Sequence, residues 1–368
     1  MPTQTAAPVS VILVNWNGRH HLAQCLPALA AQTYPNFHIL VVDNASSDGS
    51  CAYLADQWPA VRVLALSTNC GFAVANNRAI AQTDAPWVAL LNNDTVPDSG
   101  WLAALVAAGE QGGARLAAVA SRMVFFDRPA MLNSAGIAID PAGIAWDWLG
   151  GEPDATLAHA TPGVATRADA TSADATPADA SPVPVFGASG GAALYRRAAL
   201  LDVAEAVSAD RPAEVFDERF FMYLEDVDLA WRLQLRGWQS VYQPAARVLH
   251  HGSASSGEGS PFKNRLLARN KVWTVLKNYP TLPLLGYLPI ILAYDLASAP
   301  YRLLFQGQTA ALAGRLDAWA GLRGTLARRN AIQARRTAGW AEIRSTMAPL
   351  EPPWAVLRRY RHLVRHPS

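Results

Sequence analysis

Alternation between short apolar runs and helix-like stretches in the first 95 residues is the feature that most constrains the fold. The apolar runs occupy residues 9–14, 37–42, 61–66 and 87–91. Between the first two runs, Leu22, Leu26 and Leu29 follow helical spacing. Strands that alternate with helices form a parallel sheet. We therefore predict an α/β sheet whose strands end at one edge, where open sheets bind ligands.

Polar residues directly after these runs are candidates for binding chemistry. Asn92, Asn93 and Asp94 follow the fourth run, and Asp43 follows the second. A carboxylate at this edge can hold a divalent metal, because Mg²⁺ is usually bound by one or two carboxylates plus substrate phosphates. Asp43 is placed to accept hydrogen bonds from a nucleoside. The tetrapeptide Asn92–Thr95 is also ordinary turn and helix-cap chemistry, so residue type alone leaves both interpretations open.

Motifs that are absent from the sequence exclude several classes of protein. Neither GxGxxG nor GxxxxGK[ST] occurs at the turns, which argues against a Rossmann dinucleotide site and a P-loop NTPase. Cys25, Cys51 and Cys70 are too scattered for a disulfide framework or a CxxC metal site, which fits a reducing cytosol. MPTQTAAP has no basic start and the first apolar run is short, so we predict no signal peptide.

A second acidic cluster lies in the stretch FDERFFMYLEDVDLAWRLQLRGW. The apolar residues after Asp226 follow helical spacing, and Asp228 lies four residues before Arg232, the spacing of an intrahelical ion pair. Asp228 is therefore assigned a structural role. Glu225 and Asp226 stand at the start of this helix, where the helix dipole favours carboxylates. On spacing alone, these two are simply helix N-terminal acids.

Four segments in order, VNWNG, VVDNASSDGS, NCGFAVANN and LLNNDT, resemble the nucleotide-binding half of family 2 glycosyltransferases, especially bacterial rhamnosyltransferase-like members. The resemblance implies a GT-A fold, a Rossmann-like and mostly parallel central sheet flanked by helices. It implies a catalytic domain over residues 1–255, and the basic, apolar pattern of residues 256–368 indicates a helical C-terminal extension. It also implies inverting transfer of a sugar, with rhamnose the first choice, from a nucleotide-diphosphate donor to a hydroxyl of a lipid-linked or cell-surface glycan.

The resemblance also assigns roles to single residues. The implied nucleotide-binding set is Val14, Asn15, Trp16, Asn17, Asp43, Asn69, Gly71, Asn77, Asn92 and Asn93. Gly190 and Gly191 are expected to line the donor-sugar and acceptor cleft, although glycines of this kind are by default tight-turn residues. Asp226 is expected to be the general base that takes the proton from the acceptor hydroxyl, with Glu225 in support.

The same resemblance predicts a divalent metal, Mg or Mn, beneath the diphosphate. Asn92 stands where the family's DXD-type motif usually begins with Asp, which leaves Asp94 as the carboxylate ligand. His250 matches the family's histidine near the metal, and His251 is the reserve. Imidazole suits Mn²⁺ better than Mg²⁺. A lone histidine is more often structural, so His250 ranks behind Asp94.

The formal net charge of +2 conceals a division of the chain. Residues 1–260 carry 14 Lys and Arg against 25 Asp and Glu, whereas residues 261–368 carry 17 against 4. An apolar run at residues 282–305 has the length of a membrane span, but prolines, a glycine and charges interrupt it. In residues 315–344, arginines alternate with Leu and Trp, as is typical of a membrane-surface helix.

We therefore expect a cytoplasmic protein attached peripherally to anionic lipid at the inner face of the cell membrane. A basic helix of this kind also suits a dimer interface or nucleic acid. The chain carries no recognisable nucleic-acid motif, so nucleic acid is not expected as a partner. The sequence leaves open whether the chain forms an oligomer.

Residues 152–184 break the pattern of the catalytic domain. They consist mainly of Ala, Thr, Asp, Pro and Ser, and they lack the bulky apolar side chains needed to offset the entropy of ordering. We predict a disordered or irregular surface insertion. A neutral expansion and a lid over the acceptor are the two interpretations of it.

Two rival functions remain at this point. A sugar nucleotidyltransferase also uses a nucleotide-binding α/β sheet and a metal, but it needs a glycine-rich, basic loop after the first strand, and NWNGRH is a poor match. The other rival is a non-catalytic protein that binds a nucleotide sugar or nucleic acid.

Overall fold

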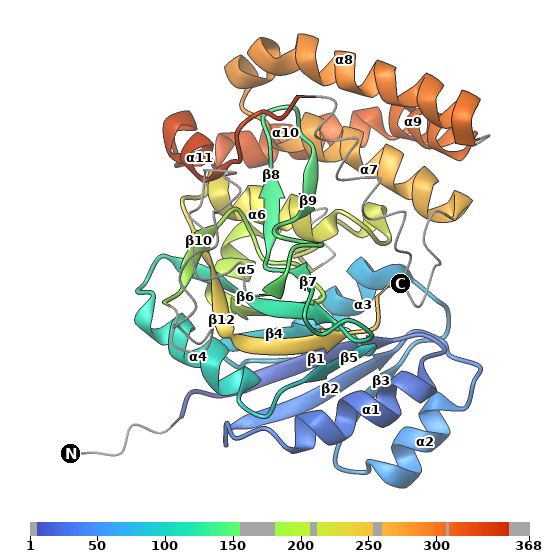
Figure 1. Cartoon of the computed structure of the whole chain (residues 1–368), viewed down its shortest axis with the longest axis vertical. Helices are drawn as coiled ribbons and strands as arrows, with labels where there is room; N and C mark the ends of the chain where they lie inside the picture. Colours follow the sequence, from blue (N-terminus) through green and yellow to red (C-terminus); the bar gives the residue numbers. More distant parts are fainter. Residues whose placement is uncertain (1–5, 155–180, 207–211, 253–259, 307–308, 353–368) are drawn as a thin grey trace.

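The computed structural model describes residues 6–154, 181–206, 212–252, 260–306 and 309–352. Its strands are β1 (Val9–Asn15), β2 (Phe37–Asp43), β3 (Arg62–Ala65), β4 (Trp87–Leu91), β5 (Thr95–Pro97), β6 (Leu116–Phe125), β7 (Leu132–Ser134), β8 (Ile137–Ile139), β9 (Ala145–Asp147), β10 (Val183–Val185), β11 (Ala192–Arg196) and β12 (Gln239–His250). β8 and β9 form a hairpin of their own, and the other strands form one ten-stranded sheet (Figure 1).

Helices cover both faces of this sheet and extend beyond it. They are α1 (Arg19–Ala30), α2 (Ser50–Gln57), α3 (Gly71–Ile80), α4 (Trp101–Gln111), α5 (Arg197–Val203), α6 (Glu225–Leu235), α7 (Pro261–Asn278), α8 (Thr281–Gln306), α9 (Ala310–Ala320), α10 (Leu322–Ala334) and α11 (Trp340–Thr346), with a 3₁₀ turn η3 at Glu218–Phe220. The sequence prediction of alternating strands and helices in the first 95 residues is confirmed.

The half of the sheet that carries the predicted nucleotide site is parallel. β3, β2, β1 and β4 lie side by side in this order, and all three pairings are parallel. Asn15 is the register partner of Asp43 where β1 and β2 end. Because parallel strands end at one edge of a sheet, the polar residues that follow them come together there.

The other half of the sheet is mixed. β11 runs antiparallel to both of its neighbours, β4 and β6, whereas β12 is parallel to β6. β11 therefore brings the Gly190–Gly191 approach to the carboxyl end of β4. β12 ends with His250 beside β5, so that His250 is the register partner of Thr95.

Two apolar cores lie on opposite faces of the sheet. On one face, α1 and α4 bury side chains such as Leu26 and Leu105 against Leu13 of β1. On the other face, α3, α5 and α6 pack against the sheet through residues that include Leu200 and Leu233. The alternation of side chains along each strand supplies both faces, which is why the strands read as nearly continuous apolar runs.

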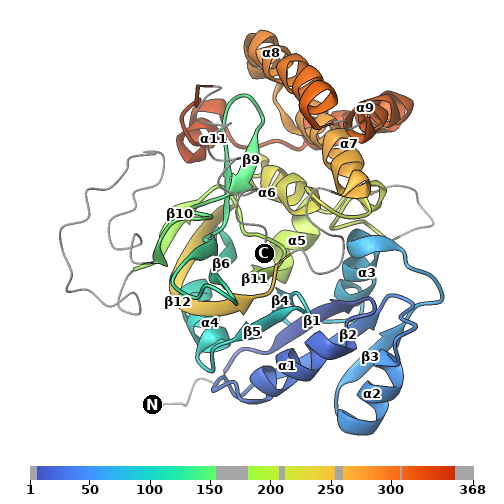
Figure 2. The same cartoon turned by 45° about the vertical axis from the view of Figure 1, so that its right-hand side comes forward.

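The C-terminal helices lie on the side of α6 away from α1 and α2, with α7 packed against α6 (Figures 1 and 2). Trp231 of α6 lies against Tyr279 at the end of α7, with ring centroids 4.6 Å apart. Trp231, Tyr279, Ile343 and Met347 belong to one buried cluster. The region after residue 260 therefore shares a core with the chain before residue 253 and is not a separate tail.

A buried ion network joins the two parts of the chain. Lys277 of α7 is fully buried, and its Nζ lies 2.8 Å from Glu205, 2.9 Å from Asp217 and 2.8 Å from Asp228. Arg232 pairs with Asp228 at 2.9 Å, so the predicted intrahelical ion pair and the structural role of Asp228 are confirmed. The carboxylates and Lys277 compensate one another, and removing one partner would leave an unpaired buried charge.

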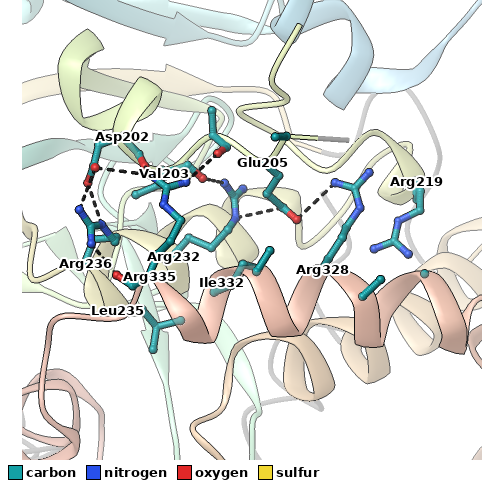
Figure 3. Close-up of a pocket in the computed structure, with 15 residues that line it drawn as sticks. Asp202, Val203, Glu205, Arg219, Arg232, Leu235, Arg236, Arg328, Ile332 and Arg335 are labelled. Carbon is teal, nitrogen blue, oxygen red and sulfur yellow. Dashed lines mark hydrogen bonds and ion pairs between the residues drawn. The ribbon is translucent and has the colours of Figure 1, made fainter. Parts of the chain in front are cut away.

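Several of the arginines that suggested a membrane-facing helix point into the protein. The predicted segment divides at Gly321 into α9 and α10. Arg328 of α10 pairs with Glu214 at 2.8 Å, and Arg335 donates to the carbonyl oxygens of Ala204 and Asp202. Figure 3 shows these side chains reaching from α10 towards Asp202 and Glu205. Part of the basic charge thus pairs with acidic residues before residue 253, although Arg323, Arg335 and Arg336 are exposed.

The predicted insertion is ordered at both of its ends. Asp154 forms an ion pair with Arg122, and β10 pairs antiparallel with β12 through Val183 and Val185. Residues 152–154, 181 and 182 have irregular backbone, and among the described ends only β10 is regular structure. The prediction of a disordered or irregular insertion otherwise stays a prediction. Residues 155–180 lie outside the described residues.

Within the described part of the chain, no helix combines the length and apolar character needed to cross a bilayer. α8 contains the apolar run at residues 282–305.

Candidate active site

Three buried side chains form a continuous hydrogen-bond chain across the carboxyl ends of β2, β1 and β4. Asn15 donates from Nδ2 to Asp43 Oδ2 at 3.0 Å, and its Oδ1 accepts from Asn93 Nδ2 at 2.7 Å. The second oxygen of Asp43 accepts from the backbone N–H of Ser46 at 2.9 Å. The parallel register creates this chain, because it ends β1 and β2 level with each other.

The first loop folds over this chain directly after Val14 and Asn15. The Ser46 hydroxyl accepts from the backbone N–H of Asn17 at 2.9 Å, which ties the loop after β1 to the loop after β2. Asn17 has a left-handed φ of 52°, a conformation that asparagine tolerates better than most residues. Trp16 is 42% exposed, so its ring is an accessible flat surface next to the buried amides.

The turn before α3 brings Asn69 and Gly71 to the same edge. Asn69 Oδ1 accepts from the Gly71 N–H at 3.0 Å and from Asn44 Nδ2 at 2.9 Å. Gly71 has a φ of +83°, and a Cβ there would approach the carbonyl oxygen of Phe221 to 2.5 Å. Glycine is required at this position because α3 begins in direct contact with the turn that precedes α6.

Asp94 and His250 stand together where β4 and β12 end. Asp94 Oδ1 lies 3.4 Å from His250 Nε2, and it is buried without a hydrogen-bond partner. His250 Nδ1 lies 2.8 Å from Asn133 Oδ1. His250 therefore turns its Nε2 towards the Asp94 carboxylate. Burial opposes the charge on Asp94, but attraction to His250 and His21 outweighs it and lowers the pKa of this carboxyl.

This pair has the chemistry of a divalent metal site completed by substrate. Among the described residues, no cluster of three or more potential ligands forms a self-contained metal site. One carboxylate oxygen without a partner and one oriented imidazole are a partial ligand set, which suits a metal that takes its other ligands from phosphate oxygens and water. The fixed orientation of His250 by Asn133 is the support that metal-ligating histidines usually have.

Glu225 and Asp226 begin α6, next to the Gly190–Gly191 loop. Asp226 accepts from the backbone N–H groups of Gly190 at 2.9 Å and Val227 at 2.8 Å. Glu225 Oε2 is buried without a partner. Burial raises the pKa of both carboxyls, and the neighbouring Asp226 raises that of Glu225 further. Because only Asp226 receives these two N–H donors, we assign the negative charge to Asp226 and the proton to Glu225.

The Gly190–Gly191 loop joins the two sides of the site. The carbonyl of Gly191 accepts from the Asn92 N–H at 2.8 Å, while the Gly190 N–H donates to Asp226. A Cβ on Gly191 would lie 3.1 Å from Met123 and 3.4 Å from Asn92, so there is little room for a side chain. These bonds connect the NNDT turn to the start of α6 through a single loop.

The backbone just before Asp226 is strained. Phe221, Tyr223 and Leu224 have φ values of 65°, 70° and 63°. At Phe221 ψ is −64°, and the Met222 N–H donates to the Phe220 carbonyl at 2.8 Å, which is the rare γ-turn with positive φ. Such conformations cost about 1–3 kcal/mol each and persist only where surrounding contacts enforce them.

Two predicted residues lie differently from the others. Asn77 donates to the carbonyl of Phe216 at 2.8 Å and accepts from its N–H at 2.8 Å. Its amide therefore supports the segment before η3, which accounts for it structurally. His251, the reserve ligand, stacks on Phe126 and bonds Gln24, so its ring already has two partners, although it is close enough to interact with the charge of Asp94.

The structure adds site residues that no motif indicated. Asn133 orients His250, and Asp147 at the end of β9 lies close enough to Ser134 and Asp226 to interact with both. The segment between β6 and β10 has no catalytic pattern in sequence, so only its fold over the sheet identifies these residues.

A cavity of about 440 Å³ lies away from this site, between α5, α6 and α10 (Figure 3). Its lining includes Arg219, Arg236, Arg328 and Arg335, and none of the predicted site residues. These arginines are already bonded to protein carboxylates or carbonyls. The cavity is therefore a junction between the catalytic half and the C-terminal helices.

Comparison with known proteins decides the family. Residues 10–153 match the family profile described as glycosyl transferase family 2. Over 258 residues, the chain is 32% identical to an N-acetylglucosaminyl-diphospho-decaprenol L-rhamnosyltransferase of Mycobacterium tuberculosis. The aligned region covers 67% of this chain and 77% of the relative. The chain belongs to glycosyltransferase family 2. Membership confirms the predicted enzyme class, an inverting glycosyltransferase.

This family 2 glycosyltransferase is also similar to a longer relative and to a solved structure. It is 28% identical over 259 residues to the O-antigen biosynthesis protein RfbC of Myxococcus xanthus, covering 69% of this chain but 18% of that protein. The crystal structure of GalNAc-T7 with UDP, GalNAc and Mn²⁺ superimposes with a TM-score of 0.53 at 15% identity, over 74% of this chain and 48% of the other. This likeness concerns the fold and confirms the predicted GT-A architecture.

Proposed function

We propose that this enzyme transfers rhamnose from a nucleoside-diphosphate donor to a hydroxyl group of a lipid-linked glycan precursor. The mycobacterial relative is named for transfer of L-rhamnose to N-acetylglucosaminyl-diphospho-decaprenol, which supports both the sugar and the acceptor class. The observation that carries the proposal is the hydrogen-bonded sequence Asn92, Gly191, Gly190 and Asp226, which joins the strand end beside Asp94 to the candidate base.

Asp226 would act on the acceptor. Its carboxylate takes the proton from the attacking hydroxyl as the acceptor oxygen bonds to the anomeric carbon of the sugar. The bond from that carbon to the diphosphate breaks in the same step, and the nucleoside diphosphate leaves. A single displacement from the face opposite the leaving group inverts the anomeric centre. The raised pKa of Asp226 suits a base, because proton transfer is most effective when the pKa lies near the working pH.

Asp94 and His250 would hold a divalent metal, Mg²⁺ or Mn²⁺. When bound, the metal stabilises negative charge on the leaving diphosphate. The solved structures of GalNAc-T7 and of a Pyrobaculum calidifontis mannosyltransferase were obtained with Mn²⁺. The protein's own contribution is to present one free carboxylate oxygen and one oriented imidazole nitrogen at this edge.

The loops around Asp43 would bind the nucleoside. The chain from Asp43 through Asn15 to Asn93 fixes the amides, and Trp16 offers a ring for stacking. Asn69 and Gly71 close the other side of the same edge. This arrangement holds polar atoms in place before a ligand arrives, which lowers the entropy cost of binding.

The C-terminal helices would rest on the membrane surface that carries the acceptor. Leu282 and Leu285 of α8, and Leu316 and Trp319 of α9, are all strongly exposed. Exposed leucines with an interfacial Trp are typical of segments that lie in the headgroup region. Because several arginines are engaged internally, the apolar side chains would contribute more to this attachment than the charge pattern alone suggests.

A donor and acceptor screen tests the proposed reaction. We expect dTDP-L-rhamnose to release dTDP only when an N-acetylglucosaminyl-diphospho-polyprenol acceptor is present, with the new linkage inverted relative to the donor. Turnover with UDP-sugars alone would overturn rhamnose as the donor sugar. A product with retained configuration would overturn the single displacement.

Liposome flotation tests the membrane proposal. Trp319→Ser is expected to reduce binding to vesicles of mixed anionic and neutral lipid, whereas Trp58→Ser, in the catalytic half, serves as the control. Equal flotation of both variants and the parent protein would contradict attachment through α9. Comparing anionic with purely neutral vesicles separates the contribution of charge.

A further inference from the structure

The segment between η3 and α6 holds three left-handed residues directly before the candidate base, and α7 enforces this shape. Asn270 of α7 is fully buried. Its Nδ2 donates to the carbonyl oxygens of Phe220 at 3.1 Å, Met222 at 3.0 Å and Tyr223 at 2.8 Å. One side chain therefore collects three carbonyl groups that the positive φ angles turn to the same side.

Arg269 orients the Asn270 amide, and α3 adds a further contact to the turn. Asn270 Oδ1 accepts from Arg269 Nε at 2.9 Å, which orients its amide group, and Arg269 Nη2 donates to the Phe220 carbonyl at 2.9 Å. From α3, the Ala73 N–H donates to the Phe221 carbonyl at 3.1 Å. The turn is thus clamped between α7 and the start of α3, which belongs to the predicted nucleotide site.

The end of this turn determines where α6 begins. Leu224 is the last left-handed residue, and Glu225 is the first residue of α6. Asp226 follows, held by the Gly190 N–H. A relaxed turn would let the start of α6 shift or rotate, which would move the Asp226 carboxylate relative to the NNDT side of the cleft.

We propose that Asn270 is a positioning residue for the catalytic base: by holding the left-handed turn, it sets the place of Asp226 in the cleft. The proposal rests on the proposed function, in which Asp226 accepts the proton of the acceptor. It assigns part of the catalytic geometry to α7, in the C-terminal region.

The test compares Asn270→Ala with Val275→Ala, a buried position on the same helix that does not bond the turn. Asn270→Ala is expected to lower kcat by roughly 100-fold, the size of loss that a misplacement of about 1 Å can cause. The KM for dTDP-L-rhamnose should stay within about threefold, because binding groups on β1 and β4 are untouched. Val275→Ala should keep kcat within about threefold of the parent enzyme.

A double-mutant cycle separates positioning from a general loss of structure. If Asn270 acts through Asp226, then Asn270→Ala lowers the residual turnover of Asp226→Asn no further. Multiplicative losses in the double variant would overturn the proposal, and so would an Asn270→Ala kcat equal to that of Val275→Ala. Full turnover of Asp226→Asn alone is the separate sign that the base assignment itself has failed.

A second variant covers the case in which Asn270→Ala does not fold. Asn270→Ser keeps one hydroxyl donor near the three carbonyls, so a smaller loss in kcat of roughly tenfold is expected with the same unchanged donor KM. Wild-type kcat in a folded Asn270→Ser and a raised donor KM would both count against a positioning role.

Discussion

The nucleotide half, from β1 to β5, and the C-terminal helices, from α7 to α11, contribute to the site in different ways. In the nucleotide half, side chains at strand ends face the cleft edge themselves, as the chain from Asp43 to Asn93 does. In the C-terminal region, Asn270 bonds the turn before α6, and Lys277 pairs with a buried carboxylate of α6. One region presents the candidate binding groups, and the other fixes the helix that carries the proposed base.

The difference shows for which charged residues a sequence pattern can predict the position. A carboxylate after a buried strand has its position set by a few neighbouring residues. The partners of Lys277 lie 49 to 72 residues away, and Arg328 lies 114 residues from Glu214. The opposite net charges of the two parts arise in part because the parts pair with each other. The charge pattern alone had favoured an external partner.

Deletion of the chain after residue 255 tests the comparison most severely. Removing α7 would leave Asp217 and Asp228 buried without Lys277 and would expose the ring of Trp231. We expect the remaining chain to lose cooperative unfolding, measured by circular dichroism during thermal and urea titration. A cooperative transition together with intact nucleotide binding would show that the C-terminal helices are a separable unit.

Lys277→Met tests the ion network alone. Three carboxylates would lose their buried cation, so the free energy of unfolding should fall by about 3–5 kcal/mol. Lys271→Met on the same helix is the control, because Lys271 is partly exposed and lies 3.9 Å from Asp295, and it should cost less than about 1 kcal/mol. Equal losses in urea denaturation would contradict a special role for the network.

Asp140→Asn tests a buried carboxyl that has no such compensation. Burial raises the pKa of Asp140 to about 6 from an ordinary value of 3.8, so the folded state binds the proton more tightly. Stability should then fall as pH rises from 4 to 6, and the ionised group costs up to about 3 kcal/mol above that range. Asp140→Asn should be more stable than the parent at pH 8 and gain little at pH 4. A gain independent of pH would contradict this assignment.

Asp94→Ala tests the metal assignment in the nucleotide half. Metal-dependent donor binding, measured by calorimetry across a Mn²⁺ titration, should weaken by roughly 10–100-fold or more, since losing even a supporting residue of a metal site has this effect. Asp98→Ala is the matched control, because Asp98 is an exposed partner of Arg247. An unchanged metal requirement would place the ligand elsewhere.

Much of the fold and part of the site could be predicted from sequence. The strands and helices up to Asp94 follow local periodicity, and the resemblance placed Asp94, His250 and Asp226. Asp147 and Asn133 could not be predicted, because they reach the site only through the way residues 126–152 fold over the sheet. Asn270 looks like an ordinary helix residue in sequence, and its role depends on carbonyl groups 47 to 50 residues away.

Replacement of Asp226 by Asn tests the central claim most directly. With dTDP-L-rhamnose and a lipid-linked N-acetylglucosamine acceptor, sugar transfer should fall by roughly 10²–10⁴-fold, the usual contribution of a general base. Affinity for the donor, measured by calorimetry with Mn²⁺, should stay nearly unchanged, because Asp226 contacts the Gly190 backbone and not the nucleotide edge. Turnover close to that of the parent enzyme would contradict the assignment of Asp226 as the base.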